Sequence, residues 1–392
     1  MTEGGTDEIL IAGGGIGGLA TALALSIQGL PCRILEQSSE FREIGAGIHL
    51  GPNVFRACDH LGIMEQMIEK AVFVEHLAMM DSLSGEEITR VQVKDTCLER
   101  YGYPYAIHHR ADMLDVFLKA CKDSPLITLE TSRRVDRIDD NGDTVTVQTE
   151  DGSTYAGRAL IGADGLWSAV RAYLFGDEMP RVTGHIAYRA VLPMDEVPEE
   201  LKQNAAMLWV GPRNHLIHYP IRDWELFNVV AVFHSDKYVE GWNEPGDREE
   251  LLTRFADVGT LPMSLLERVS DWRMWVLCDR EPTDVWSRGR VTLIGDAAHP
   301  MLQYFAQGAA MAIEDGLCVA RKIANNDGDL ETEFQAYQQD RYLRTGRVQY
   351  MARFLGEVYH AEGVKRDLRN QLLGARTQAK AMEGLDWLYG GP

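Results

Sequence analysis

The sequence lacks the marks of several protein classes. Its six cysteines form no CxxC pair and no Cys/His cluster with metal-ligand spacing, so no metal site is predicted and reduced thiols in the cytoplasm are expected. Basic residues are few: 39 Lys and Arg against 59 Asp and Glu give a formal charge of −20. This balance argues against a nucleic-acid partner and against an anionic membrane surface. The start, MTEGGTDE, has no basic region, so no secretory signal is expected.

Long uninterrupted apolar runs are also missing. The stretch from Ile9 to Leu30 approaches the length of a membrane span, but GGGIGG and a Ser-Ile-Gln-Gly segment interrupt it. We find no internal repeat and no low-complexity linker. A chain of 392 residues is long enough for one large domain or two ordinary ones.

A glycine cluster stands between an expected strand at 8–12 and an expected helix at 16–28. It fits GxGxxG at Gly13, Gly15 and Gly18, in the strand–turn–helix context that the motif needs. Such a loop lets backbone approach a pyrophosphate, and the helix N-terminus supplies N–H donors. Glu36 ends the next strand and is placed to bind a ribose hydroxyl. The motif predicts a dinucleotide but leaves NAD and FAD both open.

The order of the expected elements predicts a mixed α/β (α+β) fold. A βαβ start, strand-then-helix pieces near the end and helix over most of 330–359 indicate a Rossmann-like domain with C-terminal helices. Strand patterns dominate from residue 181 to 235 and indicate an antiparallel sheet. We therefore predict a discontinuous nucleotide-binding domain over 1–175 and 281–392, and a β-rich substrate domain over 176–280.

Charged residues follow several of the expected strands. Asp164 and Asp296 end two apolar strands, and Arg110 precedes a helix in HHRADML. Acids at strand ends suit the hydroxyls of a ribityl chain, which FAD has and NAD lacks. A salt bridge or helix cap would explain any one of these residues taken alone.

Four ordered motifs then point to one family. GGGIGG, HRADML, IGADGLWSAVR and LIGDAAHP together resemble the single-component FAD-dependent aromatic monooxygenases, the para-hydroxybenzoate-hydroxylase-like class. The resemblance implies FAD held by Glu36, Arg42, Arg110, Asp164 and Asp296, with the segment 45–53 beside the flavin. It also implies that Gly308 and Ala309 begin a helix aimed at the flavin's pyrimidine edge, whose dipole stabilises negative charge there. Glu314 and Asp315 are expected to cap, pair or face solvent.

The resemblance further implies the reaction. NADH or NADPH reduces FAD, and O2 then forms a C4a-hydroperoxyflavin that hydroxylates an activated phenol. MLQYFAQGA and NHLIHYPI are most similar to 3-hydroxybenzoate 6-hydroxylases, which make gentisate. On this basis His215 activates the phenol, Gln303 helps to hold it, and Tyr105 and Tyr219 bind the carboxylate, with His218 as the fallback base. A homodimer is implied as well.

Three alternatives stay open. Relatives acting on salicylate or 6-hydroxynicotinate share the FAD motifs and differ in the pocket segments. A plain NAD-linked dehydrogenase would be colourless, whereas a flavoprotein is yellow. A flavin-binding protein that turns over NADH without inserting oxygen would not need His215 and Gln303. The sequence does not distinguish NADH from NADPH, and the tail over 362–392 has no assigned role.

Overall fold

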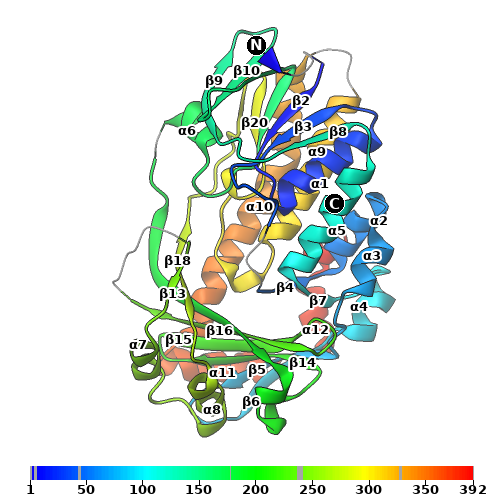
Figure 1. The fold of residues 1–392 in the computed structure, drawn as a ribbon. Coiled ribbons are helices and arrows are strands. Elements are labelled where there is room, and N and C mark those ends of the chain that lie inside the picture. The colour runs from blue at the N-terminus through cyan, green and yellow to red at the C-terminus, as the bar shows by residue number, and fades with distance from the viewer. Residues whose placement is uncertain are drawn as a thin grey trace.

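The fold comes from a computed structural model, which describes residues 2–3, 7–42, 46–176, 178–235, 242–325 and 329–391. Two large sheets lie at opposite ends of the molecule, with helices between and beside them (Figure 1). The long helix α10 (Leu330–Tyr359) runs from the upper sheet towards the lower one (Figure 1). Elements far apart in the sequence therefore meet in the middle of the molecule.

The upper sheet has the doubly wound pattern expected of a dinucleotide-binding domain. Its strand order is β19 (Ser287–Arg288), β20 (Val291–Leu293), β12 (Ala159–Gly162), β2 (Ile9–Ala12), β3 (Cys32–Leu35) and β8 (Ile127–Glu130). All neighbours are parallel except β19 and β20. The central strands are apolar and fully buried, as parallel strands covered on both faces must be.

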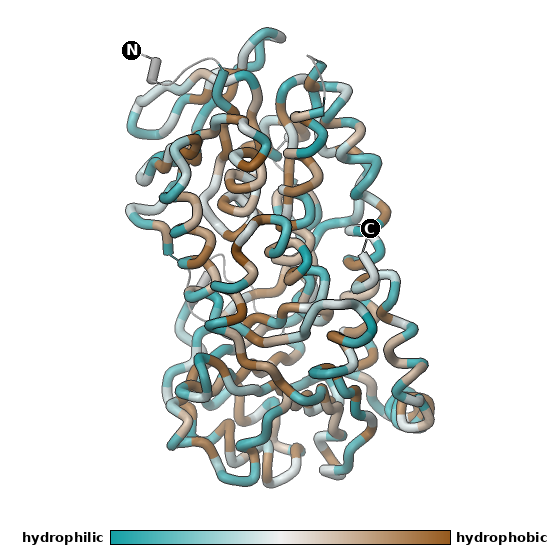
Figure 2. Tube along the Cα trace, turned by 90° about the vertical axis from the view of Figure 1, so that its right-hand side faces the viewer, coloured by the Kyte–Doolittle hydropathy of each residue, from teal (hydrophilic) through white to brown (hydrophobic). Residues whose placement is uncertain are grey.

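Helices pack against this sheet and bury its apolar side chains. They include α1 (Ile16–Ile27), α5 (Arg110–Asp123) and α9 (Gly308–Ala324). Hydrophobic stretches lie inside this half of the molecule, and hydrophilic segments dominate the outer loops (Figure 2). Arg110 is the first residue of α5 and does not precede it, so this helix begins earlier than the sequence pattern suggested.

The lower sheet has eight strands. In order they are β17 (Trp242–Pro245), β18 (Arg273–Asp279), β13 (Arg181–Pro193), β16 (Leu226–His234), β15 (Asn214–Ile221), β14 (Ala205–Gly211), β5 (His76–Asp81) and β6 (Glu87–Gln92). Only β14 and β5 pair in parallel. The sheet therefore recruits a hairpin, β5–β6, from the segment that was predicted to form the first domain.

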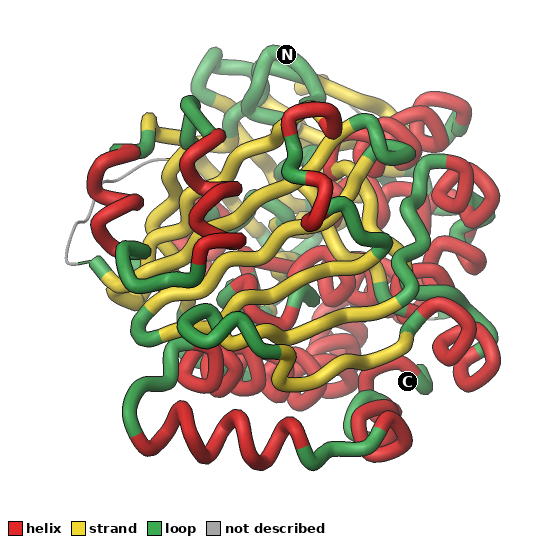
Figure 3. The backbone as a smooth tube through the Cα atoms, turned by 90° about the horizontal axis from the view of Figure 1, so that it is seen from below, coloured by secondary structure: helices red, strands yellow, loops and turns green. Residues whose placement is uncertain are grey.

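One face of the lower sheet packs under two short helices, α7 (Arg248–Arg254) and α8 (Thr260–Arg268), through an apolar cluster that includes Phe227 and Leu265. Figure 3 shows the strands running side by side with short helices in front of them. The other face turns towards the upper half, because Ile217 on it packs with Tyr304 and Phe305. This inward face of the lower sheet therefore contacts the segment that precedes α9.

Smaller elements complete the fold. A four-stranded sheet joins β1 (Thr2–Glu3), β11 (Thr154–Gly157), β10 (Val145–Thr149) and β9 (Val135–Asp140), and β4 (Gly47–Leu50) pairs with β7 (Ala106–His109). The remaining helices are α2 (Pro52–His60), α3 (Met64–Glu69), α4 (Lys94–Tyr101), α6 (Ala169–Phe175), α11 (Val364–Gly374), α12 (Gln378–Glu383) and α13 (Asp386–Tyr389). Short 3-10 turns within the described residues include Met194–Glu196, Glu199–Leu201, η3 (Gly295–Ala297) and η4 (Gln303–Phe305).

The C-terminal tail packs on the body of the molecule. Arg366 and Arg369 bind the buried carboxylate of Asp81 at 2.7 and 3.0 Å, which ties α11 to the edge of the lower sheet. Tyr389 packs against Gly51, where an added Cβ would lie 2.5 Å from the ring. Among the described helices, none has both the length and the apolar character needed to cross a membrane.

Candidate active site

The glycine loop after β2 is shaped for a close backbone approach. Gly13 has a φ of +101°, and a Cβ there would lie 2.4 Å from the carbonyl oxygen of Ala163. A Cβ on Gly18 would lie 2.0 Å from the carbonyl oxygen of Gly13. Gly15 is the N-cap of α1. The loop, strand end and helix start are thus packed backbone to backbone, as a phosphate-binding turn requires.

Glu36 lies directly beside this loop. Its carboxylate accepts hydrogen bonds from the backbone N–H of Gly14 at 2.7 Å and of Ser38 at 2.8 Å. The acid is therefore held in place at the end of β3. Its predicted role towards a ribose hydroxyl stays a prediction, but its position is the one that this role needs.

A second wall of the site is formed by η3 and the start of α9. A Cβ on Gly308 would lie 3.9 Å from an Asp296 carboxylate oxygen, and a Cβ on Gly17 would lie 3.1 Å from Ala312. Asp296 is exposed to solvent, yet burial within surrounding protein raises its pKa, opposed by His299 and Arg110. Such a carboxylate is in contact with water and yet has protein on most sides, so it lies in a recess of the surface. Arg110 and the N-terminus of α9, with Gly308 and Ala309, thus lie near Asp296.

Two other predicted cofactor residues have partners within the protein. Asp164 accepts hydrogen bonds from the Ser168 hydroxyl and from the Val170 N–H at 3.1 Å, so it helps to cap α6. Arg42 is exposed and pairs with Glu40 at 3.3 Å. Gly45, in the segment predicted to lie beside the flavin, is outside the described residues. The cofactor roles of Asp164 and Arg42 remain predictions.

Glu314 and Asp315 belong to a buried ionic network. Arg341 on α10 binds Glu314 at 2.6 Å and Asp315 at 2.7 Å. Asp315 also accepts from His299 at 2.6 Å and from the Gly295 N–H at 3.0 Å. Burial alone would raise the pKa of Asp315, but His299 and Arg341 lower it to about 2. The two acids therefore fix η3 against α9 and α10, and of the three expected roles (capping, pairing or facing solvent) the structure shows pairing.

The predicted substrate residues share one face of β15. His215, Ile217 and Tyr219 alternate with Leu216 and His218, as a strand dictates. Leu216 packs in the cluster under α7 and α8, on the opposite face. His218 accepts from the Trp209 indole N–H at 2.9 Å and stacks near Phe227 on that same outer face. The structure therefore gives His218 a core role, and it does not support His218 as the fallback base.

Tyr105 and Tyr219 meet at a residue that the sequence analysis did not single out. The Tyr105 hydroxyl lies 2.7 Å from His49 Nδ1, and the rings of His49 and Tyr219 are 4.5 Å apart, edge to face. His49 Nε2 is buried without a hydrogen-bond partner among the described residues. Burial lowers the pKa of His49 to about 4. A neutral His49 that accepts from Tyr105 at Nδ1 keeps its proton on Nε2, where it can donate to a ligand.

Gln303 is held by a second residue that sequence reasoning missed. Its side-chain oxygen accepts from the Arg189 guanidinium, which stacks over Trp275 at 5.0 Å. Arg189 pairs in register with Val230, and Val230 with Ile217, so it lies on the same face as His215. With its oxygen engaged, the Gln303 amide group has its NH2 left to donate.

His215 is buried and neutral. Its Nδ1 hydrogen-bonds His360 Nε2 at 2.7 Å, and its ring packs against Tyr304 and Tyr359. Burial, with His185 nearby, lowers the pKa of His215 to about 3. Since Nδ1 is engaged, Nε2 is the nitrogen left for a substrate.

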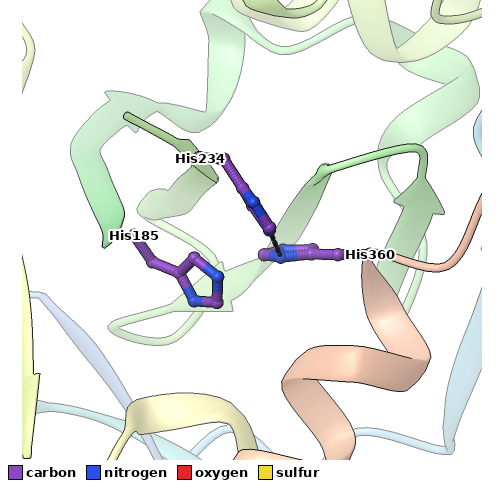
Figure 4. A group of neighbouring side chains, drawn as sticks. All are labelled: His185, His234 and His360. Atoms are coloured by element: carbon purple, nitrogen blue, oxygen red, sulfur yellow. Dashed lines mark hydrogen bonds between the residues drawn. The ribbon is translucent and has the colours of Figure 1, made fainter. Parts of the chain in front are cut away.

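Three further histidines, His185, His234 and His360, form a group (Figure 4), and His360 joins this group to His215. His234 Nε2 bonds His360 Nδ1 at 2.9 Å, and ring nitrogens of His185, His234 and His360 lie within 4.8 Å of one another. The three come from β13, from β16 and from the end of α10, so no local spacing in the sequence could reveal the group.

Comparison with known proteins places the chain. Residues 6–349 match the family of FAD binding domains. The chain is 43% identical over 381 residues to the 3-hydroxybenzoate 6-hydroxylase of Klebsiella oxytoca, covering 97% of this chain and 96% of that one. It is 44% identical over 383 residues to the protein of the same name from Polaromonas naphthalenivorans, covering 97% and 95%. The chain belongs to the FAD-dependent aromatic monooxygenases.

Solved structures agree with this assignment. Klebsiella pneumoniae HpxO complexed with FAD and uric acid superposes with a TM-score of 0.87 at 26% identity, over 98% of this chain and 97% of that one. A salicylate hydroxylase substrate complex superposes with a TM-score of 0.82 at 26% identity, over 97% and 95%. The Rossmann-like fold class predicted from the sequence is confirmed. The tight glycine loop and the recess around Asp296 fit FAD, which binds through close backbone approach and polar hydroxyl contacts.

Proposed function

We propose that this protein hydroxylates 3-hydroxybenzoate at the position para to its hydroxyl and yields gentisate, 2,5-dihydroxybenzoate. One O2 and one NADH or NADPH are consumed, one oxygen atom enters the ring, and the other leaves as water. The family and the two near-full-length relatives support the reaction class. The observation that carries the substrate is the arrangement of His215, Ile217 and Tyr219 on β15.

This arrangement suits a phenol whose carboxylate lies away from its hydroxyl. Four residues of a strand rise about 13 Å, so His215 and Tyr219 mark the two ends of an interval on one face of β15, with Ile217 in the middle. A ring with its hydroxyl and carboxylate in a meta relation reaches both ends and packs on Ile217. In salicylate the hydroxyl and the carboxylate are adjacent on the ring, so both groups lie at the same end of the interval between His215 and Tyr219.

Each residue then has a distinct task. His215 Nε2 accepts the phenolic proton, because a phenolate is far more nucleophilic at its ortho and para carbons. The Gln303 NH2 group donates to the phenolate oxygen. Tyr219 and the Nε2–H of His49 donate to the carboxylate. Tyr105, which was expected to bind the carboxylate itself, has its hydroxyl engaged by His49 Nδ1 and fixes the His49 ring instead.

The cofactor occupies the upper half of the site in this proposal. The loop with Gly13, Gly15 and Gly18 and the acid Glu36 hold the adenosine diphosphate part. Asp296 and Arg110, with Arg42 and Asp164, hold the remaining polar groups. Gly308 and Ala309 present the N-terminus of α9. When bound and reduced by NADH or NADPH, FAD supplies the oxygen-transfer chemistry, and the protein's task is to position the ring and to exclude water.

A substrate panel tests the proposal. Purified yellow protein is given NADH or NADPH, O2 and, in separate reactions, 3-hydroxybenzoate, salicylate, 4-hydroxybenzoate or 6-hydroxynicotinate. Aromatic product and hydrogen peroxide are measured. We expect gentisate from 3-hydroxybenzoate with little peroxide. A 6-hydroxynicotinate 3-monooxygenase from Bordetella bronchiseptica is 34% identical to this chain, so its substrate is the informative competitor. Product from another acid but none from 3-hydroxybenzoate would refute the substrate while leaving the family in place.

We also propose a homodimer that acts in the cytoplasm. The six thiols are unpaired, as the reducing cytoplasm would keep them. Val364, Leu368 and Leu372 recur every fourth residue on α11 and are 49 to 73% exposed. A second copy that covers this stripe would remove a large apolar surface from water. Sedimentation velocity on the FAD-loaded protein at micromolar concentration is expected to show a species of twice the chain mass, and a monomer would contradict the dimer.

A further inference from the structure

A chain of three imidazoles leads away from the proposed substrate position. His215 Nδ1 is 2.7 Å from His360 Nε2, and His360 Nδ1 is 2.9 Å from His234 Nε2. His215 and His360 are buried, and His234 is partly exposed at the end of β16. Each bond joins one ring nitrogen to the next, so the chain is continuous from the inward face of the sheet to the edge of the protein (Figure 4 shows its outer part).

The hydrogen bonds along these three histidines can run in only two directions. A neutral imidazole carries one proton, so one nitrogen donates and the other accepts. If His360 donates from Nε2, then His215 must carry its proton on Nε2 and could accept nothing from a phenol. If His215 donates from Nδ1, then His360 donates from Nδ1 to His234. His215 Nε2 then carries no proton and can accept one. Only the second direction makes His215 a base.

We infer that His360 and His234 set the tautomer of His215 and carry the phenolic proton of the substrate out to solvent. The phenol O–H bond breaks and its proton joins His215 Nε2. The Nδ1 proton of His215 passes to His360 Nε2, and the Nδ1 proton of His360 passes to His234 Nε2. His234 then releases its own Nδ1 proton to water. The electron pair stays on the phenolate oxygen, and nothing is oxidised or reduced. Return of one proton to the product oxygen along the same path restores the original tautomers.

The surroundings of the chain explain why the proton has to leave. Burial lowers the pKa of His215 to about 3 and that of His360 well below its usual value, so neither ring can store a proton taken from a phenol. If the protons move together, neither His215 nor His360 becomes a buried imidazolium cation. At the outer end, Arg213 disfavours and Glu362 favours a charged His234. His185 stacks on His234 at 4.3 Å and bonds the Tyr304 hydroxyl at 2.7 Å, so it forms a side branch.

Metal binding is a weaker explanation for the same group. The facing nitrogens of His234 and His360 already hydrogen-bond each other. The lone pair of one nitrogen and the proton of the other therefore point at each other, and they do not point towards a common metal position. The chain of hydrogen bonds uses every facing nitrogen from His215 to His234 without rearrangement.

His360→Phe tests the inference, which rests on the proposed function. The phenyl ring keeps the packing against His215 and removes both nitrogens. FAD-loaded enzyme is reduced, bound to 3-hydroxybenzoate and mixed with oxygenated buffer, and product is followed through one turnover in H2O–D2O mixtures. In the natural enzyme the rate should fall along a bowed curve with deuterium fraction, because several protons move together. In His360→Phe we expect a rate lower by roughly tenfold or more and a straight line, with unchanged dissociation constant for 3-hydroxybenzoate.

Tyr359→Phe is the matched control. Its ring also packs on His215, and its hydroxyl donates to the Tyr304 carbonyl, outside the chain. It should keep the rate and the bowed curve. Equal rates and straight lines in all three proteins would overturn the relay, whereas absence of product in the natural enzyme would refute the proposed function instead. Should His360→Phe not fold, 15N NMR of histidine-labelled, substrate-free holoenzyme decides: a proton on His360 Nδ1 supports the relay, and one on Nε2 overturns it.

Discussion

Replacement of His215 by asparagine is expected to lower aromatic product formation by about 10²- to 10⁴-fold, the usual contribution of a positioned general base. Asparagine keeps a polar group near His360 but accepts no proton from a phenol. The FAD content should stay that of the natural protein, because the glycine loop and the recess around Asp296 lie on other elements. NADH should still be oxidised, with hydrogen peroxide formed in place of product. Product is measured by chromatography and FAD by its visible absorption.

His218→Asn is a close control for this experiment. His218 lies on the same strand and is as buried as His215, but it faces α7 and α8 and bonds Trp209. A general weakening of β15 would affect both variants alike. We expect product formation close to the natural rate in His218→Asn, and a large loss in Gln303→Leu as well as in His215→Asn. A natural rate in both of the latter variants would exclude the assignment of the pocket.

Local sequence patterns predicted the nucleotide-binding half closely. The helix α10 fills the whole of Leu330–Tyr359, where the sequence predicted helix over most of the stretch, because no proline interrupts the helical pattern there. GxGxxG and the acids at strand ends are also local signals. Each of them depends on a few consecutive residues, whose backbone conformation is set before any distant contact forms.

The lower half of the site was predicted less completely. The hairpin β5–β6 joins the large sheet through a parallel pairing of β5 with β14, more than 120 residues later in the chain. No alternation within either strand reveals such a partner. His49, Arg189 and His360 were missed for the same reason: each lies far along the chain from the residue that it binds. Histidines and arginines in ordinary strand and helix positions gain meaning only once the sheet brings them together.

The pairing of Glu314 and Asp315 is a second feature that the sequence alone could not predict. The sequence allowed capping, pairing or exposure, and the choice depended on Arg341 and Arg344, a full helix away. Spacing within α9 could not select a partner on α10. The same network yields the strongest prediction about stability.

Arg341→Met is expected to lower the free energy of unfolding by about 3–5 kcal/mol, the usual cost of removing one partner from a buried ionic network. Arg341 is 3% exposed and holds two carboxylates on neighbouring residues of α9. Without it these carboxylates stay buried with fewer partners. The hydrogen bond that the Gly295 N–H donates to Asp315 positions η3 and thus Asp296, so the variant should also retain less FAD. Urea unfolding and the FAD content of the purified protein measure both effects.

Lys322→Met provides the control on the same two helices. Lys322 on α9 pairs with Asp340 on α10 at 2.7 Å, but both side chains are partly exposed, so its loss should cost about 0–1 kcal/mol. The pH dependence separates the two variants further. The pKa of Asp315 is lowered from 3.8 to about 2 in the folded protein, so its ionised form stabilises the fold above the unfolded pKa, and this contribution is lost as the pH falls towards 2. In Arg341→Met the carboxylates protonate at higher pH, which relieves the buried charge. The stability gap to the natural protein should therefore be larger at pH 7 than at pH 4, and a gap that is equal at both pH values would show that lost packing, not charge, causes the effect.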